Sequence, residues 1–196
     1  MLPFALSLRS AFSHSLPATS HLARSFASSA RRNMPRTEET ASYRFNHTML
    51  RIKDPKVSIP FYTDTIGMDL VEKRDMGDFT LYFLAFDLVD GKTPEVRKAE
   101  NLNREGILEL THNHGTESLA ETPYHSGNSE PRGFGHIAIT VADVEAACAR
   151  FDKLGVPFKK RLTDGKMRNI AFILDPDGYW IEVVRVLLLF FLDVRG

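Results

Sequence analysis

The same eight-residue pattern occurs twice in this sequence, and this duplication limits the possible folds more than any other feature. His47 and His136 each begin a copy, with apolar residues at the third and fifth positions after the histidine and an aspartate at the seventh. Further along the chain, each copy is followed by one glutamate inside an apolar segment, Glu109 in the first and Glu182 in the second. Matching residues at matching places predict two related modules with one architecture.

Each module is expected to contain one helix and four strands in the order β-α-β-β-β. Alternation of apolar and polar residues predicts the strands, and Asp54 and Asp143 mark helix starts as N-cap residues. Pro60 should kink or shorten the first helix, because proline removes a backbone donor. The expected elements are strands 46–53, 68–74, 79–86 and 106–112 with helix 54–66, then strands 134–141, 156–161, 168–174 and 179–185 with helix 144–154. The fold class is therefore α+β, with two βαβββ modules forming a curved mixed sheet around a cleft.

Length and composition are those of a globular protein. The chain has 196 residues, of which 43% are hydrophobic and 26% charged. It contains no apolar run of about 18 residues, so no transmembrane span and no membrane partner are expected. The formal net charge is zero, which gives no case for nucleic-acid binding. The single cysteine, Cys148, excludes a disulfide within the chain and is expected to be a packed small residue of a helix.

Residues 1–33 have the composition of a mitochondrial presequence. Residues 1–30 contain eight serines, and residues 1–37 contain five arginines and no acidic residue. The segment around Phe26 resembles a matrix-peptidase cleavage site, with the cut after Phe26. A mitochondrial matrix location is therefore expected, with a disordered tail as the alternative. A second start at Met34 would give a cytosolic form.

The remaining boundaries follow from shifts in composition. The expected parts are a polar N-terminal arm at 34–45, the first module at 46–112, a linker at 113–132, the second module at 133–185 and an atypical apolar tail at 186–196. A charged insertion at 87–105 is expected to be a surface loop with a helical turn. The tail is too short to cross a bilayer.

The two histidines and two glutamates are candidate ligands of a divalent metal ion. Strand periodicity allows His47 and Glu109 to face one side of the first sheet, and His136 and Glu182 to face one side of the second. Imidazole nitrogens and carboxylate oxygens bind ions such as Zn²⁺, Ni²⁺ or Co²⁺, and the lack of a cysteine ligand favours an open catalytic site. Taken singly, each residue is better explained as a structural histidine or a solvated glutamate. The apolar neighbours of both glutamates and their matched placement favour the metal site, because a buried carboxylate needs a cation or hydrogen-bond donors.

The chain from Phe45 to Arg185 resembles glyoxalase I (lactoylglutathione lyase), of the vicinal oxygen chelate superfamily. The resemblance covers about 70% of the chain. It is carried by the segments His47-Thr-Met-Leu-Arg-Ile-Lys-Asp-Pro55, Leu81-Tyr-Phe-Leu-Ala85, Leu108-Glu-Leu-Thr-His-Asn113, Pro131-Arg-Gly-Phe-Gly-His136, Gly165-Lys-Met167 and Asp175-Pro-Asp-Gly-Tyr-Trp-Ile-Glu182. The family binds its metal ion through a His or Gln, a Glu, a His and a Glu, in this order. The resemblance implies that these ligands are His47, Glu109, His136 and Glu182.

The resemblance also implies the reaction and the residues that serve it. The family isomerises the hemithioacetal of methylglyoxal and glutathione to S-D-lactoylglutathione, through an ene-diolate that the metal ion stabilises. Glu182 is then the expected catalytic base, and Glu109, as the symmetry-related carboxylate, is expected to serve the opposite enantiomer. The residues implied in substrate binding are Arg51, Asn113, Arg132 and His136, with Lys160, Lys166 and Met167 on a loop that closes over the substrate.

The resemblance also implies which metal ion is bound, how the chains assemble and which alternative functions have to be considered. Zinc-binding members carry an insertion like 87–105 and an N-terminal arm, so Zn²⁺ is expected, with Ni²⁺ as second choice. Family sites form at a two-fold interface, which predicts a homodimer. The apolar tail departs from the short polar segment usual in relatives. The alternatives are a non-catalytic binding protein, which typically lacks the complete ligand set, and an iron-dependent dioxygenase, which keeps two histidines and one glutamate.

The expected location can be tested by expressing the full chain with a C-terminal tag and fractionating the cells. The tagged protein should enter mitochondria and lose its first residues near Phe26, because the segment is basic, rich in serine and free of acids. A matched chain that begins at Met34 should stay in the cytosol. An uncleaved full-length chain found only in the cytosol would contradict the prediction.

Overall fold

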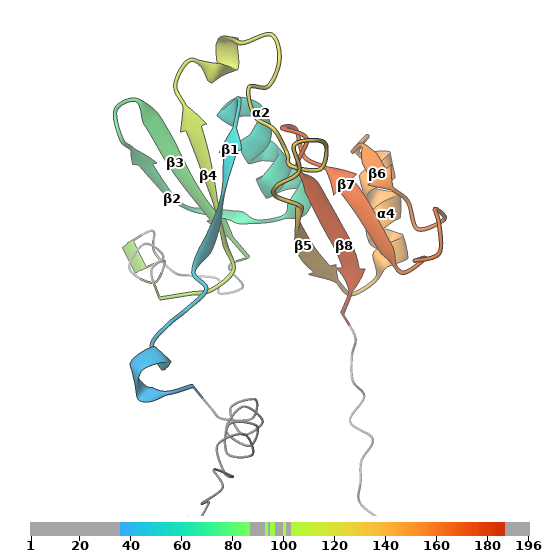
Figure 1. The fold of residues 1–196 in the computed structure, drawn as a ribbon, viewed down its shortest axis with the longest axis horizontal. Helices are drawn as coiled ribbons and strands as arrows, with labels where there is room; N and C mark the ends of the chain where they lie inside the picture. The colour runs from blue at the N-terminus through green and yellow to red at the C-terminus, as the bar shows by residue number, and fades with distance from the viewer. Residues whose placement is uncertain (1–35, 87–92, 94, 97–99, 101–102, 187–196) are drawn as a thin grey trace, which may run out of the picture. The chain divides into compact units, whose positions relative to one another are not determined.

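The two copies of the repeat form two separate four-stranded sheets (Figure 1). The computed structural model describes residues 36–86, 93, 95–96, 100 and 103–186. In spatial order, the first sheet consists of β1 (His47–Ile52), β4 (Ile107–Asn113), β3 (Phe79–Ala85) and β2 (Asp69–Asp75), and the second of β5 (His136–Val141), β8 (Trp180–Arg185), β7 (Ile170–Leu174) and β6 (Phe158–Lys160). In each sheet the first pair is parallel and the other pairs are antiparallel.

The expected fold class is confirmed, with one refinement. The curved mixed sheet of the prediction consists, within one chain, of two mixed sheets with the same order of strands. Each expected strand lies within about two residues of an observed one, and β6 is the most shortened, to Phe158–Lys160. The expected linker contains a short 3-10 helix, η4 (Thr116–Ser118).

Each helix begins at the aspartate that the sequence indicates. The Asp54 side chain accepts a hydrogen bond from the Lys56 backbone amide at the start of α2 (Pro55–Pro60). The chain continues from Pro60 as η3 (Phe61–Ile66), a π-helical segment that ends at Gly67 in the left-handed region. Proline at this point supplies no backbone donor, which explains why the α-helical hydrogen bonding stops there.

The helix of the second module repeats this start without an interruption. Asp143 accepts a hydrogen bond from the Ala146 backbone amide and caps α4 (Val144–Lys153). The face of α4 that carries Val144, Cys148 and Phe151 is buried. Cys148 is therefore a packed helix residue, as the sequence predicts.

The N-terminal part of the chain is a unit of its own. The chain divides between Tyr43 and Arg44, and the described residues before this point contain one 3-10 helix, η2 (Glu38–Thr40). The predicted presequence at 1–33, the apolar tail after Val186 and most of the insertion at 87–105 lie outside the described residues. None of the helices in the described ranges is long and apolar enough to cross a membrane.

One continuous apolar core joins the two modules. Its buried members are Leu50, Ile52, Tyr62, Met68, Tyr82, Leu84, Leu108 and Leu110 from the first module and Val144, Cys148, Phe151, Val156, Ala171, Ile173, Tyr179, Ile181 and Val183 from the second. Both sheets therefore bury one face in a shared interior. The histidine–glutamate pairs lie on the other faces.

Four buried polar side chains also connect the modules, and we call them the inter-module latch. The Tyr62 hydroxyl donates to Asp175 Oδ2 at 2.7 Å, and the Ser58 hydroxyl donates to Asp177 Oδ2 at 2.7 Å. All four residues are at most 5% exposed. The backbone amide of Lys53 donates to Asp177 Oδ1 at 2.6 Å. Buried polar groups that form hydrogen bonds across the two modules fix the relative placement of the elements that carry them.

The latch carboxylates bind protons more tightly in the folded state than in the unfolded chain. Burial is the main reason why the pKa of Asp175 is raised to about 7, and hydrogen bonds from the Tyr62 hydroxyl and the Tyr179 backbone amide act against it. Burial also raises the pKa of Asp177. An aspartate in an unfolded chain has a pKa of about 3.9. The stabilisation from protonated Asp175 is therefore complete below about pH 4 and is lost as the pH rises through about 7.

Replacement of Tyr62 by phenylalanine should destabilise the protein more at pH 8 than at pH 5. At pH 8 Asp175 is mostly ionised, so the change removes a hydrogen bond to a carboxylate, about 1.5–3 kcal/mol. At pH 5 the carboxyl is neutral and the lost hydrogen bond is weaker, about 1 kcal/mol. Urea unfolding of both proteins at both pH values gives the two differences. Tyr82→Phe is the matched control, because the Tyr82 hydroxyl makes no hydrogen bond to another described residue. If Tyr62→Phe lowered the free energy of unfolding by the same amount at the two pH values, the prediction would be contradicted.

Candidate metal and substrate site

The first histidine–glutamate pair lies on the face of the first sheet that points away from the core. His47 begins β1, and Glu109 lies opposite Met49 on the neighbouring parallel strand β4. His47 Nε2 is 3.2 Å from Glu109 Oε2. The Thr111 hydroxyl donates a long hydrogen bond, 3.4 Å, to the other carboxylate oxygen of Glu109, so the carboxylate is held from two sides.

The second pair repeats the first in the same register. His136 begins β5, and Glu182 lies opposite Ala138 on the parallel strand β8. His136 Nε2 is again 3.2 Å from Glu182 Oε2. The histidine side chains are 43% and 42% exposed and the glutamates 13% and 20%, in the first and second pair respectively. The duplication in the sequence is thus a duplication of the site geometry.

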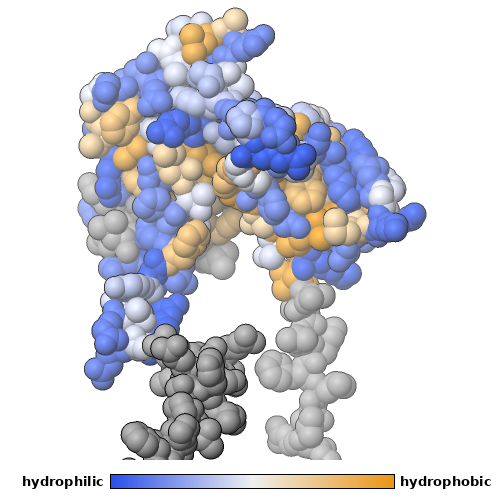
Figure 2. Space-filling model, in the orientation of Figure 1, coloured by the Kyte–Doolittle hydropathy of each residue, from blue (hydrophilic) through white to orange (hydrophobic). Residues whose placement is uncertain are grey.

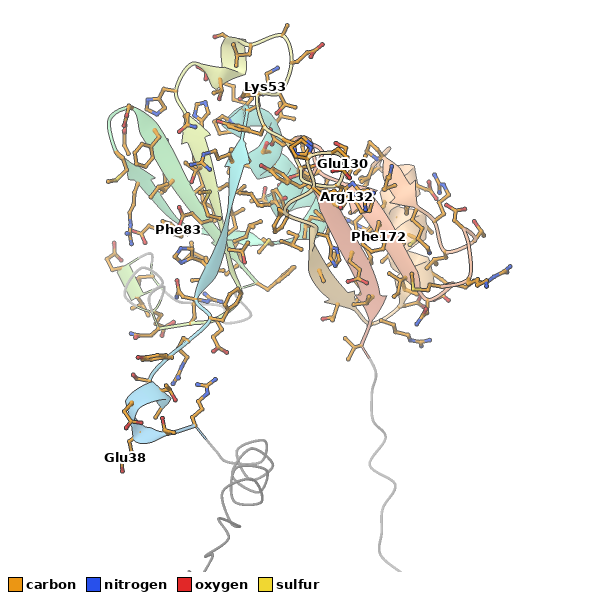
Figure 3. The ribbon with its side chains drawn as sticks, in the orientation of Figure 1. Glu38, Lys53, Phe83, Glu130, Arg132 and Phe172 are labelled. Atoms are coloured by element: carbon orange, nitrogen blue, oxygen red, sulfur yellow. The ribbon has the colours of Figure 1, made fainter. Side chains whose placement is uncertain are left out.

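An aromatic side chain completes each pair. Phe83 on β3 lies opposite Glu109 in the sheet, and its ring meets His47 edge to face with centroids 6.2 Å apart. Phe172 on β7 lies opposite Glu182 and meets His136 in the same way at 5.3 Å. Figure 3 shows the two phenylalanines, one on each sheet. The edge-to-face contact favours one orientation of each imidazole ring.

The donor atoms of each pair fit one divalent ion. Zinc binds imidazole nitrogen and carboxylate oxygen at about 2.0–2.2 Å, and two such ligands of a tetrahedral ion are about 3.3 Å apart. Both observed separations of 3.2 Å agree with this spacing. Two ligands leave a site incomplete, and no group of three or more potential ligands occurs within the described part of the chain. The structure therefore brings together His47 with Glu109 and His136 with Glu182, but not the four ligands in one chain.

The first sheet carries an additional ion pair on the face of its histidine–glutamate pair. Arg74 donates to both carboxylate oxygens of Glu72, at 2.6 and 2.8 Å. The Glu72 side chain is 5% exposed, and the Arg74 guanidinium lies over the Phe83 ring at 5.1 Å. The hydrogen bonds that Arg74 donates to Glu72 raise the pKa of Arg74, and the charge of Glu109 acts in the same direction. An ion pair without net charge therefore lies near the first histidine–glutamate pair.

A cavity of about 630 Å³ lies between the edge strands β1 and β5. His136 and Thr48 contribute to its wall, which is otherwise largely apolar. Phe45, Phe86 and Phe134 line it and remain exposed. Figure 2 shows apolar surface around the hollow between the two modules. Exposed aromatic side chains around one cavity are typical of a surface that binds another molecule.

Arg51 is the best placed of the candidate substrate-binding residues. It lines a second cavity of about 330 Å³ together with Met49, Tyr124 and His125. Its guanidinium has no side-chain partner among the described residues, whereas Tyr179 contacts its backbone. An unpaired guanidinium in a cavity can bind a carboxylate through two parallel hydrogen bonds.

Asn113 and Arg132, the other candidate substrate-binding residues of this region, do not line the second cavity themselves. The Asn113 amide donates to the Tyr124 hydroxyl at 3.0 Å, which orients it near the second cavity. Arg132, labelled with Glu130 in Figure 3, forms an ion pair with Glu130 at 2.8 Å, and both side chains are largely exposed. Such an exposed pair is weak, so Glu130 would readily give up Arg132 to another anion.

The segment that carries Arg132 is held by a close backbone approach. Gly127 has a φ of +84°, and a β-carbon there would overlap the Phe134 carbonyl oxygen. The Gly133 amide donates to the Gly127 carbonyl at 2.9 Å. Only glycine fits this position without a backbone shift. The expected linker is therefore an ordered loop that leads directly into His136.

The three residues expected on the closing loop differ in their contacts. The Lys160 ammonium donates to the carbonyl oxygens of Arg161, Met167 and Ile170 at 3.2, 2.6 and 2.7 Å. The Lys166 side chain is exposed and Met167 is 56% exposed. Lys166 and Met167 are thus presented to solvent, whereas Lys160 is fully engaged with the backbone.

Sequence reasoning missed several residues of the site. Phe83 and Phe172 could have been found from their matched places in the repeat, because each lies on a strand opposite a candidate glutamate. The Glu72–Arg74 pair carries a weaker signal, a charged i, i+2 pair in a strand whose register is interrupted by a bulge between Leu70 and Glu72. Tyr124 begins a segment, 124–136, that carries the family resemblance, but the sequence does not indicate its contact with Asn113.

Comparison with known proteins identifies relatives over most of the described chain. The sequence model of the glyoxalase/bleomycin resistance protein/dioxygenase superfamily matches residues 44–183. The chain is 55% identical over 152 residues to the lactoylglutathione lyase of Pseudomonas putida, which covers 74% of this chain and 87% of the relative. It is 48% identical over 148 residues to that of Schizosaccharomyces pombe, with 74% of this chain and 46% of the relative covered, so the chain spans about half the length of the yeast protein.

Solved structures similar to this chain include enzymes named glyoxalase I. Glyoxalase I of Leishmania major, described as trypanothione-dependent, is 34% identical, with a TM-score of 0.55 and coverage of 74% of this chain and 87% of that one. Glyoxalase I of Zea mays is 30% identical, with a TM-score of 0.55 and coverage of 72% and 44%.

Proposed function

The chain belongs to the glyoxalase/bleomycin resistance protein/dioxygenase superfamily, and we propose that it is a metal-dependent lactoylglutathione lyase. The proposed substrate is the hemithioacetal that methylglyoxal forms with glutathione, and the product is S-D-lactoylglutathione. The observation that carries the proposal is the pair of matching His–Glu arrangements, each with donor atoms 3.2 Å apart. Relatives named lactoylglutathione lyase at 55% and 51% identity support it.

His47, Glu109, His136 and Glu182 would hold the metal ion. We propose Zn²⁺ as this ion, with Ni²⁺ as the alternative. Two imidazole nitrogens and two carboxylates suit such borderline ions, and the only cysteine of the chain is buried in α4. When bound, the ion supplies a Lewis acid that polarises the oxygen atoms of the substrate.

Glu182 is the proposed general base. It would take the proton from C1 of the hemithioacetal and return it to C2, which completes the isomerisation without a net change of protons. It lies opposite Phe172, on the face of the second sheet that points away from the core, and its side chain is only 20% exposed. Limited exposure keeps the transferred proton from exchanging with bulk water. Glu109 has the same arrangement and would serve the opposite enantiomer.

The guanidinium of Arg51, which lines the second cavity, fits a glutathione moiety, which carries two carboxylates. Arg51 is the proposed main contact, because it lines the cavity and its guanidinium is free of other side chains in the described chain. Asn113 and Arg132 would add hydrogen bonds, and Lys166 and Met167 would cover the tripeptide from the loop between β6 and β7. A small-molecule dioxygenase substrate would need no such set of cations. The complete ligand set disfavours both this alternative and a non-catalytic binding protein.

We propose that the active form is a homodimer in which each site takes one His–Glu pair from each chain. The described part of one chain contains two half-sites and no complete one. The exposed phenylalanines around the cavity between β1 and β5 give apolar surface for a second copy to cover. A two-fold axis would then generate two equivalent sites from the two pairs.

The activity should depend on a divalent ion. The purified protein, mixed with methylglyoxal and glutathione, should produce a thioester that is followed by its ultraviolet absorbance. Chelation should reduce the rate at least about a hundredfold, because the polarising charge is lost, and Zn²⁺ should restore it. A rate that survives complete removal of metal, measured by elemental analysis, would contradict the proposed function.

Two inactive variants should restore activity when they share a dimer. Glu109→Gln and Glu182→Gln each alter one carboxylate of every site, and each alone should lose most of the turnover while retaining the fold. After the two are unfolded together and refolded, half of the dimers are mixed and each mixed dimer has one unaltered site of two. The expected activity is therefore about a quarter of that of the unchanged protein. The same mixing of two Glu182→Gln preparations is the control, and a lack of restoration with mixed dimers present would contradict a site shared by two chains.

A further inference from the structure

The ammonium group of Lys160 has no hydrogen-bond donor left for a substrate. A lysine ammonium carries three N–H donors and no acceptor. In this structure the three acceptors of Lys160 Nζ are the carbonyl oxygens of Arg161, Met167 and Ile170, at 3.2, 2.6 and 2.7 Å. A carboxylate of a ligand could bind this ammonium only by displacing a carbonyl oxygen.

These three carbonyl groups lie at both ends of one loop. Lys160 is the last residue of β6 and Ile170 the first of β7, so residues 161–169 connect the two strands. The ammonium therefore ties the start of the loop, its end and Met167 to a single point. Hydrogen bonds from a charged donor are stronger than those between neutral groups.

The rest of the loop is held independently of Lys160. A turn closes its first half, in which the Arg161 amide donates to Asp164 Oδ2 and the Asp164 amide donates to the Arg161 carbonyl. Arg161 also pairs with Asp152 of α4 at 2.8 Å. In the second half, Lys160 supplies the contact to the backbone of Met167, on either side of which the exposed Lys166 and Arg168 side chains lie.

The first module supplies an internal comparison. Lys160 lies opposite Phe172, the ring that meets His136, and Glu72 lies opposite Phe83, the ring that meets His47. Glu72 uses this place on its edge strand for a buried pair with Arg74. In both modules, the edge-strand position opposite the phenylalanine thus carries a charged side chain that is bonded to nearby groups and fixes local structure.

We propose that Lys160 is a positioning residue that anchors the 161–169 loop and thereby holds Lys166 and Met167 in place, and that it does not itself bind a carboxylate of the substrate. The step to substrate binding rests on the proposed function, whereas the anchoring does not. Without the anchor, the loop would have to be ordered when a ligand binds, and part of the binding free energy would be spent on this ordering.

The test compares Lys160→Met, Lys160→Arg and Lys159→Met in the metal-loaded full chain. Lys159→Met is the matched control, because it removes the same charge from the neighbouring position, where the ammonium lies over the Trp180 ring. Hydrogen exchange of the backbone amides of residues 162–169 is measured without ligand. Affinity is then measured by calorimetry for S-hexylglutathione and for its analogue with the glycine carboxylate converted to an amide.

Anchoring predicts faster exchange in Lys160→Met by at least about tenfold, partial recovery in Lys160→Arg and no change in Lys159→Met. The affinities for the two probes should fall by the same factor, about tenfold, because the loss comes from loop ordering. Unchanged exchange in Lys160→Met, or a loss confined to the probe with the free carboxylate, would overturn the proposal. If the unchanged protein binds neither probe, the proposed function fails, and the exchange result still decides the anchoring.

Discussion

The register of two parallel strand pairs is the constraint on which the candidate site depends. Glu109 lies opposite Met49, two residues after His47, and Glu182 lies in the same relation to His136. A slip of one residue would turn each glutamate to the opposite face of its sheet. Such a slip is costly, because the neighbours of the glutamates in the strands are fully or nearly fully buried in the shared core. The apolar core therefore fixes the positions of the polar ligands on the other face.

This dependence explains how much could be predicted from the sequence. Alternation of apolar and polar residues places the strands within about two residues, and the same alternation puts each glutamate on the face opposite the core. The repeat predicted that each histidine pairs with a glutamate, because the two residues occur at matching places in both copies. The helix starts at Asp54 and Asp143 were visible for a local reason, since a cap is formed with an amide two or three residues away.

The features that escaped prediction depend on distant contacts or on backbone atoms. Tyr62 and Asp175 are separated by 113 positions in the sequence, and neither has a local pattern that identifies the other as its partner. The acceptors of Lys160 are carbonyl oxygens, which every residue possesses, so no residue type marks them. The resemblance to a family pointed to the region of Lys160, which is the last residue of β6, but only the structure shows which atoms its donors reach.

The latch acquires a particular importance if each site is shared between two chains. The two half-sites of one chain would then belong to two different sites, and the contact between the modules of that chain would set the distance between them. Tyr62 and Ser58 hold this contact through hydrogen bonds to Asp175 and Asp177, deep in the core. If the latch were loosened, one His–Glu pair of each site would shift relative to the other pair of that site. This would happen although, among the described residues, no latch residue contacts the side chain of a proposed metal ligand. The stability of the core and the geometry of both sites would thus depend on the same four side chains.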